Sequence, residues 1–75
     1  MINKVRDINI DYLEHIRKDR GLTQTKVSEG LNKYDSYYTG KVNNNVRFTT
    51  EDLIKLIDIF KMDHSEILVL LGVDQ

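Results

Sequence analysis

Apolar side chains recur at helical spacing along most of the chain, and residues that begin or end helices separate these runs. In the first run, Leu13 and Ile16 fall on one side of a helix. Asn9 is a favourable N-cap, and Gly21 can adopt the left-handed conformation that follows many helices. The pattern predicts a first helix over about residues 9–20.

The outer face of this first helix is expected to be polar. Glu14 and Lys18 are four residues apart, so we expect them to form an exposed ion pair. His15 is expected on the same outer face.

The second predicted helix follows almost at once and is short. Thr23 is a suitable N-cap, and Asn32 tolerates the left-handed conformation that ends a helix. Val27 and Leu31 are four residues apart and therefore point inward together. We expect this helix over about residues 23–32.

The third predicted helix covers about residues 35–44, after a tight connection. Either Tyr34 or Asp35 is its expected N-cap. Tyr38 and Val42 share one face, and we expect Tyr38 in the core.

Two more helices are expected in the C-terminal part. Thr50 is the expected N-cap of a helix over about residues 50–61. Asp63 and Glu66 are spaced as a capping box at the start of a helix over about residues 63–71. The apolar stripe of the fourth helix comprises Leu53, Ile54, Ile57 and Phe60.

The whole chain is expected to form one all-α domain over residues 1–75, a compact five-helix bundle. It has no Pro and only four Gly, which favours helices over a strand-rich fold. It has no Cys, which excludes disulfides and thiolate zinc sites. No apolar run approaches the ~20 residues that span a bilayer. We therefore expect a soluble, cytoplasmic protein with no membrane contact.

Charge is distributed unevenly, although the net charge is only −1. Residues 15–47 hold seven basic and three acidic side chains, a net charge of +4. Residues 48–75 hold two basic and six acidic side chains, a net charge of −4. A polyanion responds to the local charge and not to the average, so the middle segment is the expected contact with nucleic acid.

The two short helices predicted over residues 23–44 are typical of a helix-turn-helix, whose second helix leans on the first and enters the major groove of DNA. The third predicted helix is the second helix of this motif, and its outer face offers hydroxyl, amide and ammonium groups that can bind base edges and phosphates. These side chains belong to Ser36, Tyr37, Thr39, Lys41 and Asn44.

Here the sequence resembles the Cro and phage-repressor helix-turn-helix family. The resemblance lies in the stretch GLTQTKVSEGLNKYDSYYTGKVNNN, whose opening Gly-Leu-Thr-Gln at residues 21–24 matches the family. Val-Ser at residues 27–28 stands where the family usually has Leu-Ala. The segments LEHIRKDR and TTEDLIKLIDIFKMDHSEIL resemble the flanking helices, so the likeness covers about residues 10–68. It implies a lambda-repressor-like fold and a transcription regulator of a phage lysis–lysogeny switch that binds double-stranded operator DNA as a homodimer.

The resemblance also implies which residues bind the macromolecule. Gln24, at the start of the second helix, would contact a phosphate. Side chains of the third helix would face the groove, and those after it would follow the phosphate backbone. The expected DNA- or partner-binding residues are Gln24, Thr25, Asp35, Ser36, Tyr37, Thr39, Lys41, Asn43, Asn44 and Arg47.

The turn before the third helix can be aligned with the family in two registers. Without a gap, Lys33 and Lys41 occupy buried positions, which is unfavourable for charged groups. One extra residue in the turn places Tyr34 and Val42 there instead, and we prefer this register.

A second class of function stays open. The chain is also similar to the modulator-of-repression proteins of lactococcal temperate phages, which act together with the phage repressor. That similarity implies an antirepressor that binds the cognate repressor by protein–protein contact. Asp35 and the acidic C-terminal block favour it, because acidic groups attract a basic DNA-binding face. A candidate apolar partner surface consists of Val69, Leu70 and Leu71.

No group of residues indicates catalysis or metal binding. His15 and His64 lie far apart in the sequence and lack a third ligand at metal spacing. Ser, His and Asp occur, but nothing in their spacing arranges them as nucleophile, base and orienting group. We therefore expect no enzyme activity, no cofactor, no metal and no small-molecule substrate.

Overall fold

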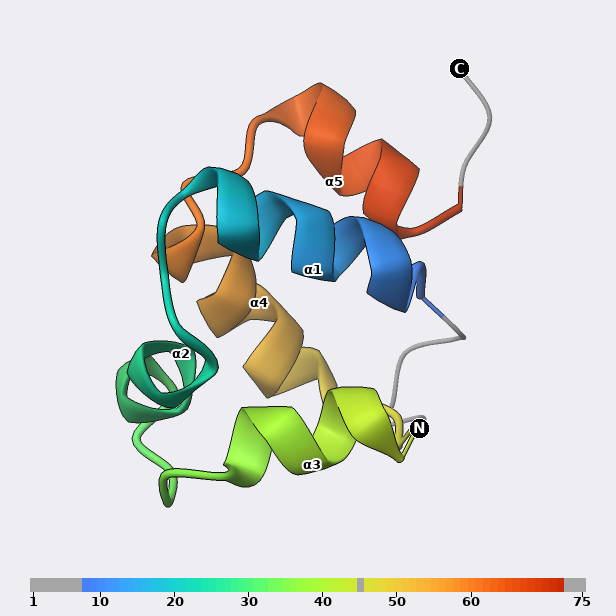
Figure 1. Ribbon diagram of the computed structural model, residues 1–75. Helices are drawn as coiled ribbons and strands as arrows, with labels where there is room; N and C mark the ends of the chain where they lie inside the picture. The colour runs from blue at the N-terminus through green and yellow to red at the C-terminus, as the bar shows by residue number, and fades with distance from the viewer. Residues whose placement is uncertain (1–7, 45, 73–75) are drawn as a thin grey trace.

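Each of the expected helices forms in the computed structural model, which describes residues 8–44 and 46–72 (Figure 1). The helices are α1 (Ile10–Asp19), α2 (Gln24–Gly30), α3 (Tyr37–Asn43), α4 (Thr50–Ile59) and α5 (His64–Leu70). No strand occurs within those two ranges. The all-α class and the five helices are therefore confirmed for the part of the chain that the structure describes.

Three helices begin at the N-cap residues that the sequence predicts. Asn9 Oδ1 accepts a backbone N–H of the first turn of α1 at 3.0 Å, and Thr23 Oγ1 does the same for α2 at 3.1 Å. Asp63 and Glu66 form a complete capping box at the start of α5. These short-range hydrogen bonds satisfy N–H groups that have no partner within the helix.

The expected N-cap of α4 is wrong by one residue. Thr49 is extended (φ −75°, ψ 164°), and its Oγ1 accepts the N–H of Asp52 at 3.1 Å. Thr50 is already helical and is the first residue of α4. Two neighbouring threonines are equivalent as caps in the sequence, and the direction in which the chain enters the helix selects the first of them.

Residues in the left-handed region follow four of the helices, and Gly72 after α5, with a φ of 76°, is one of them. Gly21 has a φ of 71° after α1, and Asn32 has a φ of 61° after α2. Lys61, which no sequence rule favours for this conformation, has a φ of 51° after α4. The predicted ranges 23–32 and 50–61 therefore extend two residues past the observed ends of α2 and α4.

All five helices contribute to the buried interior. Ile54 was expected in the apolar stripe of α4 but is 63% exposed, whereas Leu56 is fully buried. The expectation is wrong because Ile54 lies outside the arc of the helix that Leu53 and Phe60 share with Leu56. Fully covered side chains include Leu13 of α1, Val27 of α2, Tyr38 of α3, Leu56 of α4, Leu70 of α5 and Leu31 after α2.

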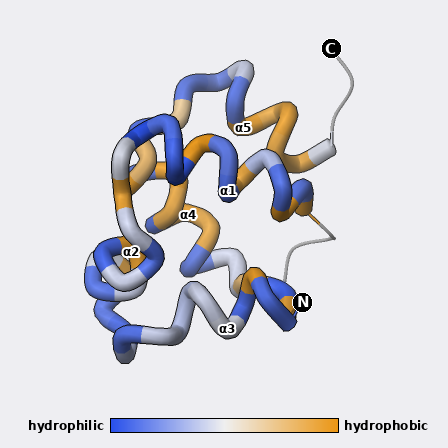
Figure 2. Tube along the Cα trace, in the orientation of Figure 1, coloured by the Kyte–Doolittle hydropathy of each residue, from blue (hydrophilic) through white to orange (hydrophobic). Residues whose placement is uncertain are grey.

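The helices divide the molecule into two ends. α1 packs against α5, while α2 packs against both α3 and α4. Figure 1 shows α4 between these groups, with α2 and α3 together at the lower end of the view. In Figure 2 the trace of α4 is largely orange, while α2 and α3 are mostly white and blue. The α2–α3 pair is therefore an end of the molecule with few apolar residues to bury.

The expected apolar partner surface at the end of α5 is only partly present. Leu70 is fully buried, so its assignment to a contact surface is wrong. Its carbonyl accepts the N–H of Asn9 at 2.9 Å, which draws the end of α5 onto the start of α1. Val69 and Leu71 are each 38% exposed, on either side of the buried leucine.

No helix in the described residues is both long and apolar enough to cross a membrane.

Candidate functional site

The inner side of α3 is anchored on α2. Tyr38 is fully buried, and its backbone N–H donates to the Oγ of Ser28 at 2.9 Å. Ser36, the N-cap residue of α3, makes no side-chain capping hydrogen bond. Ser28 therefore performs the capping from the neighbouring helix, by satisfying an N–H in the first turn of α3. Since the hydroxyl of Ser28 is itself buried, the pairing also removes the cost of burying it.

Of the two residues that the preferred register places in buried positions, Val42 is partly buried and Tyr34 is exposed. Val42 is partly buried and packs against the core, as that register predicts. Tyr34 is 69% exposed, so its side chain does not enter the interior. The helix begins at Tyr37, and Asp35 is neither a helical residue nor its cap.

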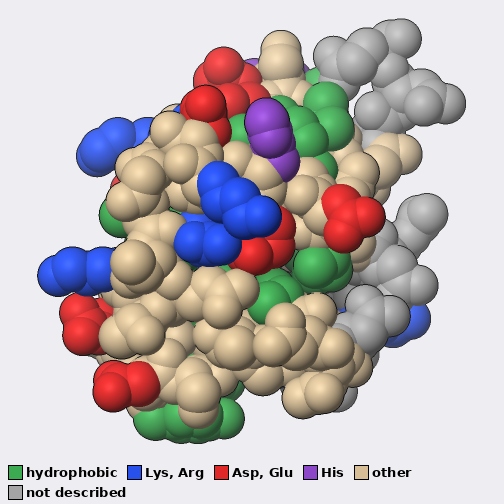
Figure 3. Space-filling model, in the orientation of Figure 1, with side chains coloured by type: hydrophobic (Ala, Val, Ile, Leu, Met, Phe, Trp, Pro, Cys, Tyr) green, Lys and Arg blue, Asp and Glu red, His purple; other side chains and the backbone are tan. Residues whose placement is uncertain are grey.

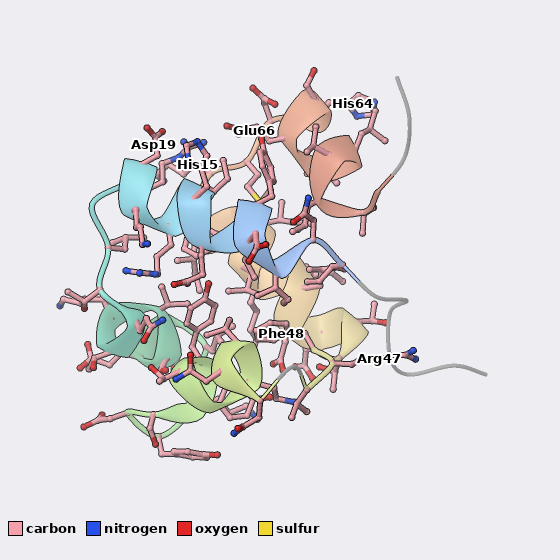
Figure 4. The ribbon with its side chains drawn as sticks, turned by 45° about the vertical axis from the view of Figure 1, so that its right-hand side comes forward. His15, Asp19, Arg47, Phe48, His64 and Glu66 are labelled. Carbon is pink, nitrogen blue, oxygen red and sulfur yellow. The ribbon has the colours of Figure 1, made fainter. Side chains whose placement is uncertain are left out.

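The expected binding residues divide into two groups by exposure. Two of the half-buried ones, Gln24 and Thr39, are joined by a hydrogen bond between their side chains. The exposed ones are Thr25, Asp35, Ser36, Asn43, Asn44 and Arg47. Figure 3 shows that the surface over α3 is mostly tan, the colour of backbone and uncharged polar side chains. Figure 4 shows Arg47 directed outward while the next residue, Phe48, points inward.

Tyr37 does not face outward as expected. Its hydroxyl donates to the carboxylate of Asp52, a residue of α4 that is only 3% exposed. Burial, followed by the hydrogen bond and the negative charge of Asp52, raises the pKa of Tyr37. The side chain therefore joins α3 to α4, and sequence spacing could not reveal this because its partner lies 15 residues away on another helix.

Lys41 is also drawn toward the protein. Its Nζ donates to the carbonyl oxygen of Arg47 at 3.0 Å and lies 5.2 Å from the ring centroid of Tyr37. It also lies 5.9 Å from the ring centroid of Phe48. Lys41 thus fastens the segment that follows α3 onto the helix, while two of its three N–H donors are left for other partners.

A hydrogen-bond network links α1, α2 and α3 through the carboxylate of Glu14. Arg17 Nε donates to it at 2.9 Å, Tyr38 Oη at 2.8 Å and Gln24 Nε2 at 3.1 Å. Thr39 Oγ1 in turn donates to Gln24 Oε1 at 2.8 Å. The expected pairing of Glu14 with Lys18 is wrong, because Arg17, Tyr38 and Gln24 hold the Glu14 carboxylate toward the α2–α3 pair.

The network changes the protonation of its acidic members. Burial alone would raise the pKa of Glu14, but hydrogen bonds from Arg17, Tyr38 and Gln24 outweigh it and hold the pKa below its usual value. Burial and the Glu14 carboxylate raise the pKa of Tyr38. Glu14 is therefore an ionised hydrogen-bond acceptor at neutral pH. Sequence reasoning missed it, and the only available signal was that a buried tyrosine needs a partner for its hydroxyl.

The positive charge around α3 is smaller than the segment charge predicts. Arg20 Nη2 donates to both carboxylate oxygens of Glu66 of α5, at 2.8 and 2.9 Å. Arg17 is neutralised by Glu14. The charged side chains of α2, α3 and the residues beside them are Lys26, Glu29, Lys33, Asp35, Lys41 and Arg47. These carry a net charge of +2 instead of the +4 of the segment.

A shallow pocket of about 220 Å³ lies beside the outer face of α3. Tyr34 meets Tyr37 edge-on there, with ring centroids 5.6 Å apart. Two of the lining side chains, Tyr34 and Val46, are 69% and 45% exposed. The pocket is lined by Tyr34, Tyr37, Gly40, Lys41, Asn44 and Val46. It gives this side of α3 an apolar and aromatic character that the outermost face lacks.

Metal binding has no support in the described residues. They contain no group of three or more His, Asp or Glu side chains that could hold a metal ion. Figure 4 places His15 on α1 and His64 on α5, on separate helices.

No family model matches the chain, and no curated protein or solved structure matches it significantly. These comparisons therefore give no support to any particular function.

Proposed function

We propose that this protein is a transcription regulator that binds double-stranded operator DNA through α2 and α3, which act as a helix-turn-helix. One observation carries the proposal: α3 is anchored on its inner side by Tyr38 and Ser28, while its outer side leaves polar side chains exposed. A DNA-recognition helix needs this combination, because it must be held rigidly and still present hydrogen-bonding groups to base edges.

The dimensions of α3 suit the major groove. An α-helix with its side chains is about 10–12 Å across, which matches the width of the major groove, about 12 Å. Most of the exposed side chains on and beside the helix are short and uncharged, which allows the backbone to approach the bases closely. Ser36, Thr39 and Asn43 are three to four residues apart and share this outer face.

Phosphate contacts are assigned to the basic residues around this face. Lys26, Lys33 and Arg47 are exposed, and they flank the proposed recognition helix in the chain. Such contacts set the position of the protein on the duplex without selecting a sequence. Asp35 would be repelled by phosphate, so it would face away from the DNA backbone in the complex. By resemblance, the regulator acts as a homodimer in a phage lysis–lysogeny switch, in the cytoplasm of a bacterial host.

The proposal is tested by fluorescence anisotropy with labelled DNA from the promoter region beside the gene, titrated over a range of salt concentrations. We expect binding at low salt that weakens steeply as salt increases, because each neutralised phosphate releases counterions. Specific binding should survive an excess of unrelated duplex. A folded protein that binds no duplex at low salt would contradict the proposal.

A second function is favoured by the pocket beside α3. Tyr34 and Val46 expose apolar surface that DNA binding does not require, and such surface often marks a contact with another protein. The second candidate is therefore an antirepressor that binds the DNA-binding domain of a phage repressor. Val69 and Leu71 are a further exposed apolar pair.

Gel-shift assays with and without the cognate phage repressor separate the two functions. A shift by this protein alone supports the first function. Loss of the shift given by the repressor, or a new shift only when both are present, supports the second. Tyr34→Ala should weaken the second activity and leave the first nearly unchanged, because the tyrosine lies outside the outer face of α3.

A further inference from the structure

The network around Glu14 determines which hydrogen-bonding groups α3 can present to a partner. The Glu14 carboxylate, when ionised, has no proton to donate and can only accept hydrogen bonds. Arg17, Tyr38 and Gln24 all donate to it, at distances between 2.8 and 3.1 Å. Any side chain that contacts this carboxylate must therefore turn a donor toward it.

This requirement orients the side-chain amide of Gln24. The nitrogen Nε2 lies 3.1 Å from Glu14 Oε1, and the opposite orientation would place two oxygens, one of them charged, at that distance. The amide oxygen of Gln24 is thereby directed at Thr39, 2.8 Å from its Oγ1. The carbonyl oxygen of an amide only accepts, so Thr39 must supply the proton of this hydrogen bond.

Thr39 has a single hydroxyl proton, and the contact with Gln24 uses it. Its Oγ1 keeps only lone pairs for any further partner. The residue lies on the outer side of α3 between Ser36 and Asn43, and its side chain is partly exposed. Toward a bound macromolecule, Thr39 is therefore an acceptor and not a donor.

We propose, resting on the DNA-binding function above, that Glu14 acts through Gln24 to make Thr39 a selective acceptor for an amino group in the major groove. In that groove the exocyclic donors are the N6 amino group of adenine and the N4 amino group of cytosine, while guanine and thymine present acceptors there. On the strand that Thr39 contacts, one base of the operator is thus adenine or cytosine. Glu14 is a positioning residue, because it touches no base.

The orientation of the network is tested first in the free protein. Neutron diffraction from crystals of deuterated protein locates the deuterons of Gln24 and Thr39 directly. We expect two deuterons on the Gln24 atom that faces Glu14, and the Thr39 deuteron directed at Gln24. A flipped amide, or a Thr39 deuteron directed away from Gln24, would overturn the inference whatever the protein binds.

The consequence for recognition is tested by selecting binding sites from a random pool of duplex DNA. Thr39→Val keeps the shape of the side chain and removes Oγ1. It should lose a preference of about twofold to tenfold for adenine or cytosine at one position, the range expected for a single hydrogen bond. Preferences at the other positions should remain.

Glu14→Gln is the informative partner variant, because the new amide offers both a donor and an acceptor to Gln24. Either orientation of Gln24 then becomes possible, so the preference should relax at the same position that Thr39→Val affects. Asp11→Asn is the matched control. It removes one negative charge from an exposed position of α1 and should leave every preference unchanged.

The outcomes separate the two proposals. If the wild-type protein binds DNA, and Thr39→Val and Glu14→Gln both retain its preference at every position, the inference about Thr39 is wrong and the DNA-binding function stands. If the folded protein selects no duplex at low salt, the DNA-binding function is wrong, and the inference about bases is wrong with it.

Discussion

Ser28 and Glu14 are two polar residues that hold α3 against the helices before it. Ser28 contacts the backbone of the buried Tyr38, and Glu14 contacts its hydroxyl. Both ends of this tyrosine are therefore hydrogen-bonded, one by α2 and the other by α1. Within the described residues, no buried side-chain nitrogen or oxygen lacks a hydrogen-bond partner. A polar core of this kind is sensitive to the loss of a single partner.

Ser28→Ala is expected to destabilise the protein, although alanine is smaller and fits the same space. It leaves the buried N–H of Tyr38 without its partner, at a cost of about 1–2 kcal/mol in the free energy of unfolding. Urea denaturation measures the change. Ser36→Ala is the matched control and should cost less than about 0.5 kcal/mol, because Ser36 makes no capping hydrogen bond. Equal effects of the two variants would contradict the role of Ser28.

The ionised Glu14 should make stability depend on pH. Its pKa is lower in the folded protein than its usual value of 4.5, so it stabilises the fold above that value. This contribution is lost as the pH falls through the folded pKa. Glu66, whose pKa is also lowered, acts in the same direction.

Comparison with Glu14→Gln isolates the contribution of Glu14. Urea midpoints measured from about pH 7 to about pH 3 should fall further for the wild-type protein than for the variant. Glu66 is present in both proteins, so its effect cancels. Parallel pH profiles would show that Glu14 is not stabilised as an anion in the folded state.

At the scale of the helices, α3 depends on its neighbours. It has seven residues, too few for an isolated helix to be stable in water, and its N-cap makes no side-chain hydrogen bond. Gly40, in the middle of the helix, lowers its intrinsic stability further. Tyr37 and Tyr38 supply the compensating contacts, to α4 and to α1.

Gly40→Ala is expected to stabilise the protein by up to about 1 kcal/mol. A Cβ at this position meets no atom within 4 Å, so nothing opposes the gain in helix propensity. Thermal unfolding measures the effect. Gly21→Ala is the control: the space there is equally open, but a φ of 71° is unfavourable for alanine. It should destabilise the protein by about 1 kcal/mol, and a rise in melting temperature for both variants would contradict the argument.

At the scale of the whole molecule, the fold mixes charges that the sequence separates. The ion pair between Arg20 and Glu66 joins the basic middle segment to the acidic C-terminal one, 46 residues apart. The radius of gyration is 11.6 Å, close to the roughly 11 Å expected of a folded chain of this length. In so small a molecule, charged groups from distant segments come within reach of one another.

Lys33 lies next to α3 in the chain and Lys18 lies on α1, so the two lysines should differ in their effect on DNA binding. Lys33→Ala should weaken binding and reduce the slope of log affinity against log salt by about 0.9, the value for one phosphate contact. Lys18→Ala removes the same charge from the exposed side of α1 and should leave the slope unchanged. Anisotropy titrations at several salt concentrations measure both slopes. Equal slopes for the two variants would place the DNA elsewhere on the surface.

The five helices, most of their caps and the burial of Tyr38 followed from the order of residues alone. Those features arise between residues close in the chain, where helical spacing and capping chemistry act directly. The side on which Tyr37 and Leu70 lie was decided by packing between helices, and both were wrongly expected to face outward. The position of Glu14 beneath Gln24 and Tyr38 was decided in the same way, since each of these partners comes from a different helix. The spacing of nearby residues does not decide whether a side chain at the edge of a helical face points inward or outward. Only the neighbours that tertiary folding brings to that side chain decide it.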